Sequence, residues 1–321
     1  MIGLKGFALI SALFMLLAFP SSLSGTTLQM IKKVGVGSFP KAILISPGAR
    51  EAVVTNFESK SFSIINLATL NVTETVPLPS EAVEMAFSPD GNRLYISNWG
   101  GGTLSVVDYL KRKIIKVVQV GDKPKGVAVS PDGSKIYVSN WASDNVMVVD
   151  SDRLIVTNTI DVGAVPRGIA LVPGRPELYV ANFRGKSISV INTESEKLVR
   201  TIQTTDNPRH IVFSSDGKKA FITHWGAGEV WVLDTSNYRV LNKIIVGEHP
   251  KTIELSPDGK RLFVANYKSN SVSVIDATEN RVILTYPVEK NPSGLAVSPD
   301  GTRLYVTGWY SNDVTVLSIK D

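Results

Sequence analysis

The tetrapeptide Ser-Pro-Asp-Gly returns at a constant interval along the chain, and this period limits the folds that the chain can adopt. Full copies begin at Ser88, Ser130, Ser256 and Ser298, and degenerate copies begin at Ser46, Val172 and Ser214. Consecutive starts are always 42 residues apart, without an insertion or a deletion, so that seven units account for residues 28–321. A fixed period of this length predicts an array of equivalent supersecondary units.

Each unit has the sequence pattern of four short antiparallel strands. In the third unit, segments rich in Val, Ile and Tyr predict strands at residues 126–130, 135–140, 145–150 and 154–162. The turn Pro131-Asp132-Gly133 separates the first two strands, because Pro presets its φ angle and Gly tolerates a positive one. No stretch of 11 or more residues has helical periodicity. We therefore expect an all-β chain.

A four-stranded unit cannot bury both of its faces alone, and closing such units into a ring buries them all. A linear array would need atypical end units, which the sequence lacks. We therefore predict a seven-bladed β-propeller with four antiparallel strands per blade. Residues 28–36 align with the fourth strand of a unit and residues 314–319 with the third. The N-terminal outer strand is accordingly predicted to pair with the three C-terminal strands and to close the ring.

The first 25 residues differ from the repeats. Lys5 precedes an apolar segment of 13 residues, Phe7–Phe19, and Pro20 and small serines follow it, a pattern typical of a signal peptide. The segment is shorter than the ~20 residues of a membrane span, although an uncleaved anchor is an alternative. We expect residues 1–25 to be a signal peptide and residues 26–321 to be one propeller domain without a membrane span. The protein is then periplasmic, extracellular or at the cell surface.

The composition excludes several kinds of chemistry. The chain has no cysteine, which rules out disulfides, thiolate metal sites and cysteine nucleophiles. Its net charge of +5 permits an anionic partner, but no basic run indicates a nucleic-acid-binding tail. The motifs of zinc proteases, serine hydrolases, P-loop proteins and dinucleotide-binding proteins are absent. We predict no cofactor.

Three segments carry a family resemblance. Residues 95–99, 137–141 and 305–307 read YISNW, YVSNW and YVT. Together with the Ser-Pro-Asp-Gly turn they resemble the YVTN β-propeller repeat, and the resemblance extends over all seven units. That family includes surface-layer and periplasmic proteins, a periplasmic single-stranded-DNA binder and subunits of redox enzymes, and related seven-bladed propellers include lactonases. The resemblance implies the fold and says little about function, because one fold supports many functions.

Basic residues recur at the position just before the first strand of a unit. Five of the seven units have one there, namely Lys41, Lys125, Arg167, Arg209 and Lys251. The first strand is the innermost strand of a propeller blade, so we predict that these side chains ring one mouth of the central channel and bind an anion. Arg167 and Arg209 are the candidates for bidentate contacts. The alternative is a set of solvated surface charges.

Aromatic residues recur directly after the second strand of each unit. The position holds Phe57, Trp99, Trp141, Phe183, Trp225, Tyr267 and Trp309. One interpretation is that each ring packs against the neighbouring blade. The other is an aromatic surface for stacking a ligand, for which Trp99, Trp141, Trp225 and Trp309 are the candidates.

Three ionisable residues interrupt the small and apolar residues of the first strand. Glu84, His210 and Glu254 are predicted to line the channel, where they contact water or one another. His224 and His249 fall at the same mouth, which raises the question of a metal site. Residues 210 and 224 are expected on opposite faces of their sheet, however. We predict no metal ligand and no catalytic residue.

The strict regularity favours a non-enzymatic binding or scaffold protein, because active sites usually bring irregular loops. The predicted partner is an anionic ligand or an envelope protein, with nucleic acid as one possibility. Two alternatives stay open: a lactonase-like or metal-dependent hydrolase with a site in the channel, and a docking subunit of an envelope redox complex. The sequence does not fix the oligomeric state.

Overall fold

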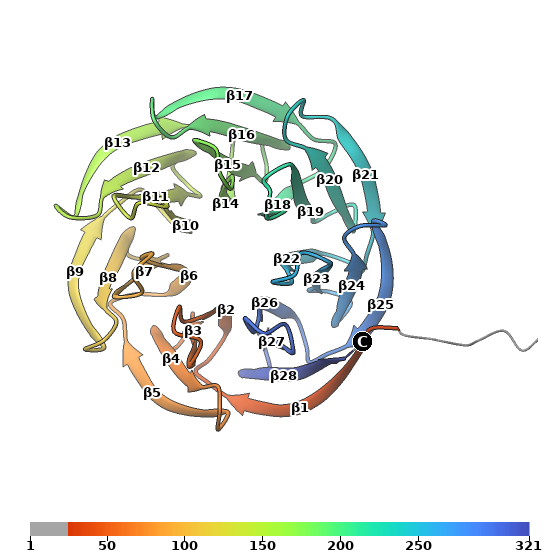
Figure 1. The fold of residues 1–321 in the computed structure, drawn as a ribbon. Coiled ribbons are helices and arrows are strands. Elements are labelled where there is room, and N and C mark those ends of the chain that lie inside the picture. Colours follow the sequence, from red (N-terminus) through yellow and green to blue (C-terminus); the bar gives the residue numbers. More distant parts are fainter. Residues whose placement is uncertain (1–24, 321) are drawn as a thin grey trace, which may run out of the picture.

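The computed structural model describes residues 25–320, which form seven four-stranded antiparallel sheets arranged around a central axis (Figure 1). The described residues are all strands, turns and connecting segments, without a helix. The predicted seven-bladed propeller is therefore confirmed. The predicted signal peptide lies outside the described residues except for Gly25. Within residues 25–320 no helix could cross a membrane.

The strands repeat in a fixed order from the centre of the ring to its edge. The innermost strands are β2 (Pro40–Ile45), β6 (Ala82–Phe87), β10 (Pro124–Val129), β14 (Pro166–Leu171), β18 (Pro208–Phe213), β22 (Pro250–Leu255) and β26 (Pro292–Val297). The second strands are β3 (Glu51–Asn56), β7 (Arg93–Asn98), β11 (Lys135–Asn140), β15 (Glu177–Asn182), β19 (Lys219–His224), β23 (Arg261–Asn266) and β27 (Arg303–Gly308). The third strands are β4 (Ser61–Asn66), β8 (Thr103–Asp108), β12 (Asn145–Asp150), β16 (Ser187–Asn192), β20 (Glu229–Asp234), β24 (Ser271–Asp276) and β28 (Asp313–Lys320). The outer strands are β5 (Asn71–Pro77), β9 (Lys113–Gln119), β13 (Ile155–Asp161), β17 (Lys197–Gln203), β21 (Val240–Ile245), β25 (Arg281–Pro287) and β1 (Thr27–Gly35).

The ring closes through its first strand. β1 pairs antiparallel with β28, from Thr27 opposite Lys320 to Gly35 opposite Asp313, and the sheet has the order β1-β28-β27-β26. In Figure 1 the two ends of the described chain accordingly lie side by side in one blade. The predicted closure is thus confirmed, and the last blade is built from both ends of the chain.

The predicted strands of the third unit agree closely with the structure. The second and third strands, 135–140 and 145–150, coincide with β11 and β12. The first strand begins two residues earlier than predicted, because Pro124 pairs with Asn140 ahead of a bulge. The fourth begins one residue later, because Leu154 has a φ of 55° and belongs to the turn.

The hydrophobic core lies between neighbouring blades. The contact between the third and fourth blades, for example, joins Tyr137 and Val148 from one sheet to Leu178 and Val180 from the next, all fully buried. Each blade buries both faces in this way, as the repeat argument requires. Burial of such apolar side chains is the main term that stabilises the ring.

A hydroxyl group joins consecutive blades close to the axis. The bulge between Pro124 and Val127 leaves the Gly126 N–H outside the strand ladder. Ser139 Oγ accepts a hydrogen bond from this N–H at 2.9 Å and donates one to the carbonyl oxygen of Arg167 in the next blade at 2.7 Å. The hydroxyls at the equivalent position make the same pair of bonds in three other blades, from Thr55, Ser97 and Thr307.

Two blades have alanine in place of this hydroxyl, Ala181 and Ala265. In the blade of Ala265, the inner-strand residue Thr252 donates a hydrogen bond from its own Oγ1 to the carbonyl oxygen of Ser293 at 2.5 Å. The link to the next blade is therefore retained by a different side chain. The Ser or Thr of the repeat thus links the inner strands of consecutive blades at four places in the ring.

Removing one bridging hydroxyl is expected to destabilise the ring. Ser139→Ala leaves the buried Gly126 N–H and the Arg167 carbonyl without this partner, which should lower the free energy of unfolding by about 1–3 kcal/mol. The measurement is urea denaturation followed by tryptophan fluorescence. Ser195→Ala, which removes an exposed hydroxyl bound to Asn192, is the control and should cost less. Equal losses in both variants would contradict the bridging role.

Candidate functional site

The seven innermost strands enclose a cavity of about 150 Å³ on the axis of the ring. Glycines on three of these strands let neighbouring backbones approach closely. A Cβ atom added at Gly126, Gly168 or Gly294 would lie 2.6 Å from a carbonyl oxygen of the next blade. The cavity is narrow because these strands have no side chain at their point of contact.

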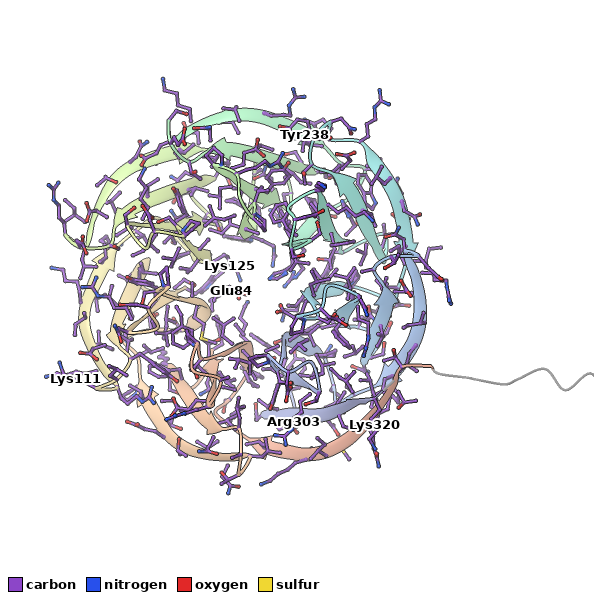
Figure 2. The ribbon with its side chains drawn as sticks, viewed as in Figure 1. Glu84, Lys111, Lys125, Tyr238, Arg303 and Lys320 are labelled. Carbon is purple, nitrogen blue, oxygen red and sulfur yellow. The ribbon has the colours of Figure 1, made fainter. Side chains whose placement is uncertain are left out.

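All five basic residues predicted from the repeat line this one cavity. Figure 2 shows Lys125 and Glu84 pointing into the central opening. Lys41, Lys125 and Lys251 are only 7%, 9% and 7% exposed, respectively. Solvated surface charges, the alternative interpretation, therefore do not describe these three lysines. The structure brings the basic residues together, and their role in binding stays a prediction.

Burial lowers the pKa of each cation in the cavity. It lowers the pKa of Lys41 to about 8, against the attraction of Glu84, and that of Arg167 to about 10. The pKa values of Lys125, Lys251 and Arg209 also lie well below their ordinary values, first because of burial and then because of repulsion by neighbouring cations. Charges that are desolvated and repel one another would be stabilised by a negative charge placed among them.

The aromatic residues of the repeat form a wall around these cations. The contacts from cation to ring centre are Lys125–Trp99 at 4.0 Å, Arg167–Phe183 at 4.2 Å, Arg209–Trp225 at 4.3 Å, Lys251–Tyr267 at 4.8 Å, Lys251–Trp309 at 4.8 Å and Lys41–Trp309 at 5.6 Å. An aromatic face attracts a cation more strongly when the cation is desolvated. The rings thus hold the basic side chains in place around the axis.

The four candidate tryptophans have different surroundings. Trp99, Trp225 and Trp309 contact cavity cations, whereas Trp141 contacts Lys123 at 5.3 Å and Trp99 at 5.2 Å. All four are half-buried. The rings do pack against neighbouring side chains, as the first interpretation held. Ligand stacking on their exposed parts stays a prediction.

Glu84, His210 and Glu254 also line the cavity, where the sequence places them. Burial raises the pKa of Glu254 to about 8, so this carboxyl is largely protonated at neutral pH. Burial lowers the pKa of His210, and its Nδ1 has no hydrogen-bond partner in the described residues. Within residues 25–320, no three His, Asp or Glu side chains are grouped as a metal site.

The other two histidines do not join His210. His224 is fully buried inside its blade and stacks on Trp231, with ring centres 4.2 Å apart. His249 stacks on Trp225 at 4.4 Å. The expectation that His210 and His224 point to different sides agrees with this placement.

Sequence reasoning missed the pairing of His224 with Trp231. Four blades have a buried asparagine whose Nδ2 donates a hydrogen bond to a serine seven residues later: Asn56–Ser63, Asn98–Ser105, Asn182–Ser189 and Asn266–Ser273. In the blade of β18–β21, histidine replaces the asparagine and tryptophan replaces the serine. The signal was in the repeat alignment, because two aromatic rings replace the asparagine and the serine together in this unit.

Fold and site define a seven-bladed β-propeller with a cationic central cavity. The family model described as lactonase, seven-bladed β-propeller, matches residues 193–321, and the model described as YNCE-like β-propeller matches residues 22–132. Each match covers less than half of the chain, and together they support a β-propeller family. Neither is the YVTN repeat family, so that resemblance stays a prediction.

No curated protein matches the chain. Among solved structures, a chain of Kuenenia stuttgartiensis hydrazine synthase is similar, with a TM-score of 0.82 and 24% sequence identity over 87% of this chain and 95% of that chain. At this level of identity the similarity shows the fold alone. In all, 1784 chains of solved structures match, so the fold by itself selects no function.

The raised pKa of Glu254 predicts a pH-dependent stability. Its ordinary pKa is 4.5 and burial raises it to about 8, so the folded protein holds this proton more tightly than the unfolded chain does. The stability contributed by Glu254 is complete below about pH 4.5 and is lost as the pH rises through about 8. Glu254→Gln removes this loss. The variant should therefore become more stable relative to the wild type as the pH rises from about 4.5 to about 8.

Urea denaturation at intervals from pH 5 to pH 9 measures this difference. Glu248→Gln is the matched control, because its carboxylate is 66% exposed, and its difference from the wild type should stay flat. If the free energies of unfolding of the wild type and of Glu254→Gln changed in parallel with pH, Glu254 would not be protonated in the folded protein.

Proposed function

We propose that this chain is a non-enzymatic binding or scaffold propeller of the cell envelope, which holds an anionic ligand, or an acidic group of a partner protein, in its central cavity. The observation that carries the proposal is the convergence of five basic side chains from five different blades on one cavity.

The charge balance of the cavity supports an anionic ligand. Glu84 is the carboxylate whose charge acts on Lys41, Lys251 and Arg209, while Glu254 is largely protonated at neutral pH. Positive charge therefore exceeds negative charge at the axis. Low-dielectric walls focus such a potential at the opening and raise the local concentration of anions.

The regularity of the ring supports binding rather than catalysis. Every unit has the same length, and within residues 25–320 the connections between strands are short, so none of them closes over the cavity as a lid. The signal-peptide pattern of residues 1–25 supports export to the envelope. An envelope redox complex is one setting in which the ring could dock a partner through the same face.

A lactonase-like hydrolase is the second candidate. It is favoured by the match of residues 193–321 to the lactonase propeller model and by the presence of His210 and Glu254 in one cavity. Burial leaves His210 neutral and Glu254 largely protonated, the states of a general base and a general acid. Hydrolysis of a simple lactone by the wild type, lost in Glu254→Gln, would favour this candidate over the binding protein.

The binding proposal predicts that retention of a ligand depends on the cavity arginines. The immobilised wild type is incubated with envelope extract, and retained protein, nucleic acid, polysaccharide and small anions are identified by mass spectrometry. Arg167→Gln/Arg209→Gln should lose the retained material, because it removes both planar donors from the cavity.

The matched control carries the same charge change on the outside of the ring. Lys113→Gln/Lys116→Gln alters two exposed lysines of β9 and should retain the material as the wild type does. The proposal would be contradicted if the wild type and both variants retained the same material, or if none of them retained any.

A further inference from the structure

We propose that the ligand is a small oxyanion with two or more negative charges, which enters the ring whole, rather than a polymer that lies across its face. This proposal rests on the proposed function and names the class of ligand for the same site. It is carried by the size of the cavity, the depth of its cations and the donors that they present.

The size of the cavity limits the ligand. At about 150 Å³ the cavity resembles the engineered protein cavities that hold one benzene molecule, or about six non-hydrogen atoms. A tetrahedral oxyanion such as phosphate or sulfate fits this space. A nucleotide or a sugar acid with several rings does not fit inside this space as a whole.

The depth of the cations excludes a polymer on the surface. The side chains of Lys41, Lys125 and Lys251 are more than nine-tenths buried, and aromatic rings contact the charged nitrogen of each. Trp99 and Trp309, which contact these nitrogens, are only half-buried, so a polyanion lying across the face would reach the rings more readily than the lysines. A ligand that pairs with the lysines must therefore pass the rings and enter the channel.

The donors favour an oxyanion over a simple halide. Arg167 Nε is buried and has no hydrogen-bond partner within the described residues. A guanidinium group matches two oxygens of an oxyanion in a bidentate contact, which a spherical ion cannot use. The protonated carboxyl of Glu254 is a further O–H donor in the lining of the same cavity.

The charge of the cavity sets the charge of the ligand. The titratable and charged groups that face it are Lys41 of β2, Glu84 of β6, Lys125 of β10, Arg167 of β14, Arg209 and His210 of β18, and Lys251 and Glu254 of β22. β26 contributes Gly294 and Leu295, which do not titrate. Each negative charge placed among these cations relieves part of their repulsion and favours the protonated lysines, so a multiply charged anion gains more than a singly charged one. Binding should also return protons to the lysines.

Calorimetric titration of the purified full-length protein tests the proposal. Sodium phosphate, sodium sulfate, sodium chloride, oligothymidylate and a heparin fragment are titrated in turn at pH 7 and constant ionic strength. We expect phosphate or sulfate to bind with one-to-one stoichiometry, at least tenfold more tightly than chloride or either polymer. Arg167→Gln should weaken that binding at least tenfold, whereas Lys113→Gln should leave it unchanged.

Proton uptake by the protein when the anion binds is a second readout. A merely structural role of Arg167 would not produce it. At pH 8.5, the heat of phosphate or sulfate binding should differ between buffers with different ionisation enthalpies, in the direction of proton uptake by the protein. Tighter binding of a polymer than of either small anion, sensitive to Arg167→Gln, would overturn this proposal while the binding function stands. Binding of none of the probes would overturn both.

Discussion

The hydroxyl that joins consecutive inner strands holds the backbone carbonyl of three of the five basic residues in the central site, Lys41, Lys125 and Arg167. Ser139 ties the bulged strand of its own blade to the carbonyl of Arg167, and the same geometry recurs through Ser97 and the carbonyl of Lys125. The backbone of each of these basic residues is thereby fixed by the neighbouring blade. Close contact at the glycines draws the strands together, so their basic side chains are directed into one narrow space.

The stability of such a cavity is a compromise. Desolvating five cations is unfavourable, and their mutual repulsion adds to the cost. Contacts with aromatic rings and the charge of Glu84 offset part of it. A ring assembled from regular repeats gains nothing structurally from this arrangement, since the blades of Val83 and Ser293 close without a basic residue at that position. Local violations of the packing pattern are expected at functional sites.

Much of this structure could be predicted from the repeat. The strict period, the strand pattern of the third unit and the alignment of residues 28–36 with an outer strand were sufficient for the blades and for ring closure. The same alignment placed Glu84, His210 and Glu254 on the inner strand. It placed the basic residues just before that strand, whereas the structure includes them in it. The burial of the basic side chains could not be predicted from the sequence, because it depends on how closely the seven inner strands approach one another. The contacts between the basic and the aromatic residues of the repeat could not be predicted either, nor could the stacking of His224 on Trp231. Both depend on how the side chains pack in the folded ring.

The most direct test of the buried cationic cavity is to follow the side-chain carbons of Lys41, Lys125 and Lys251 by NMR, in selectively labelled protein, as the pH is raised with and without sulfate. We expect all three lysines to lose their proton well below the usual lysine pKa of about 10.4 without the anion, and at higher pH with it. Lysines that titrate at the usual value, with no response to sulfate, would contradict it.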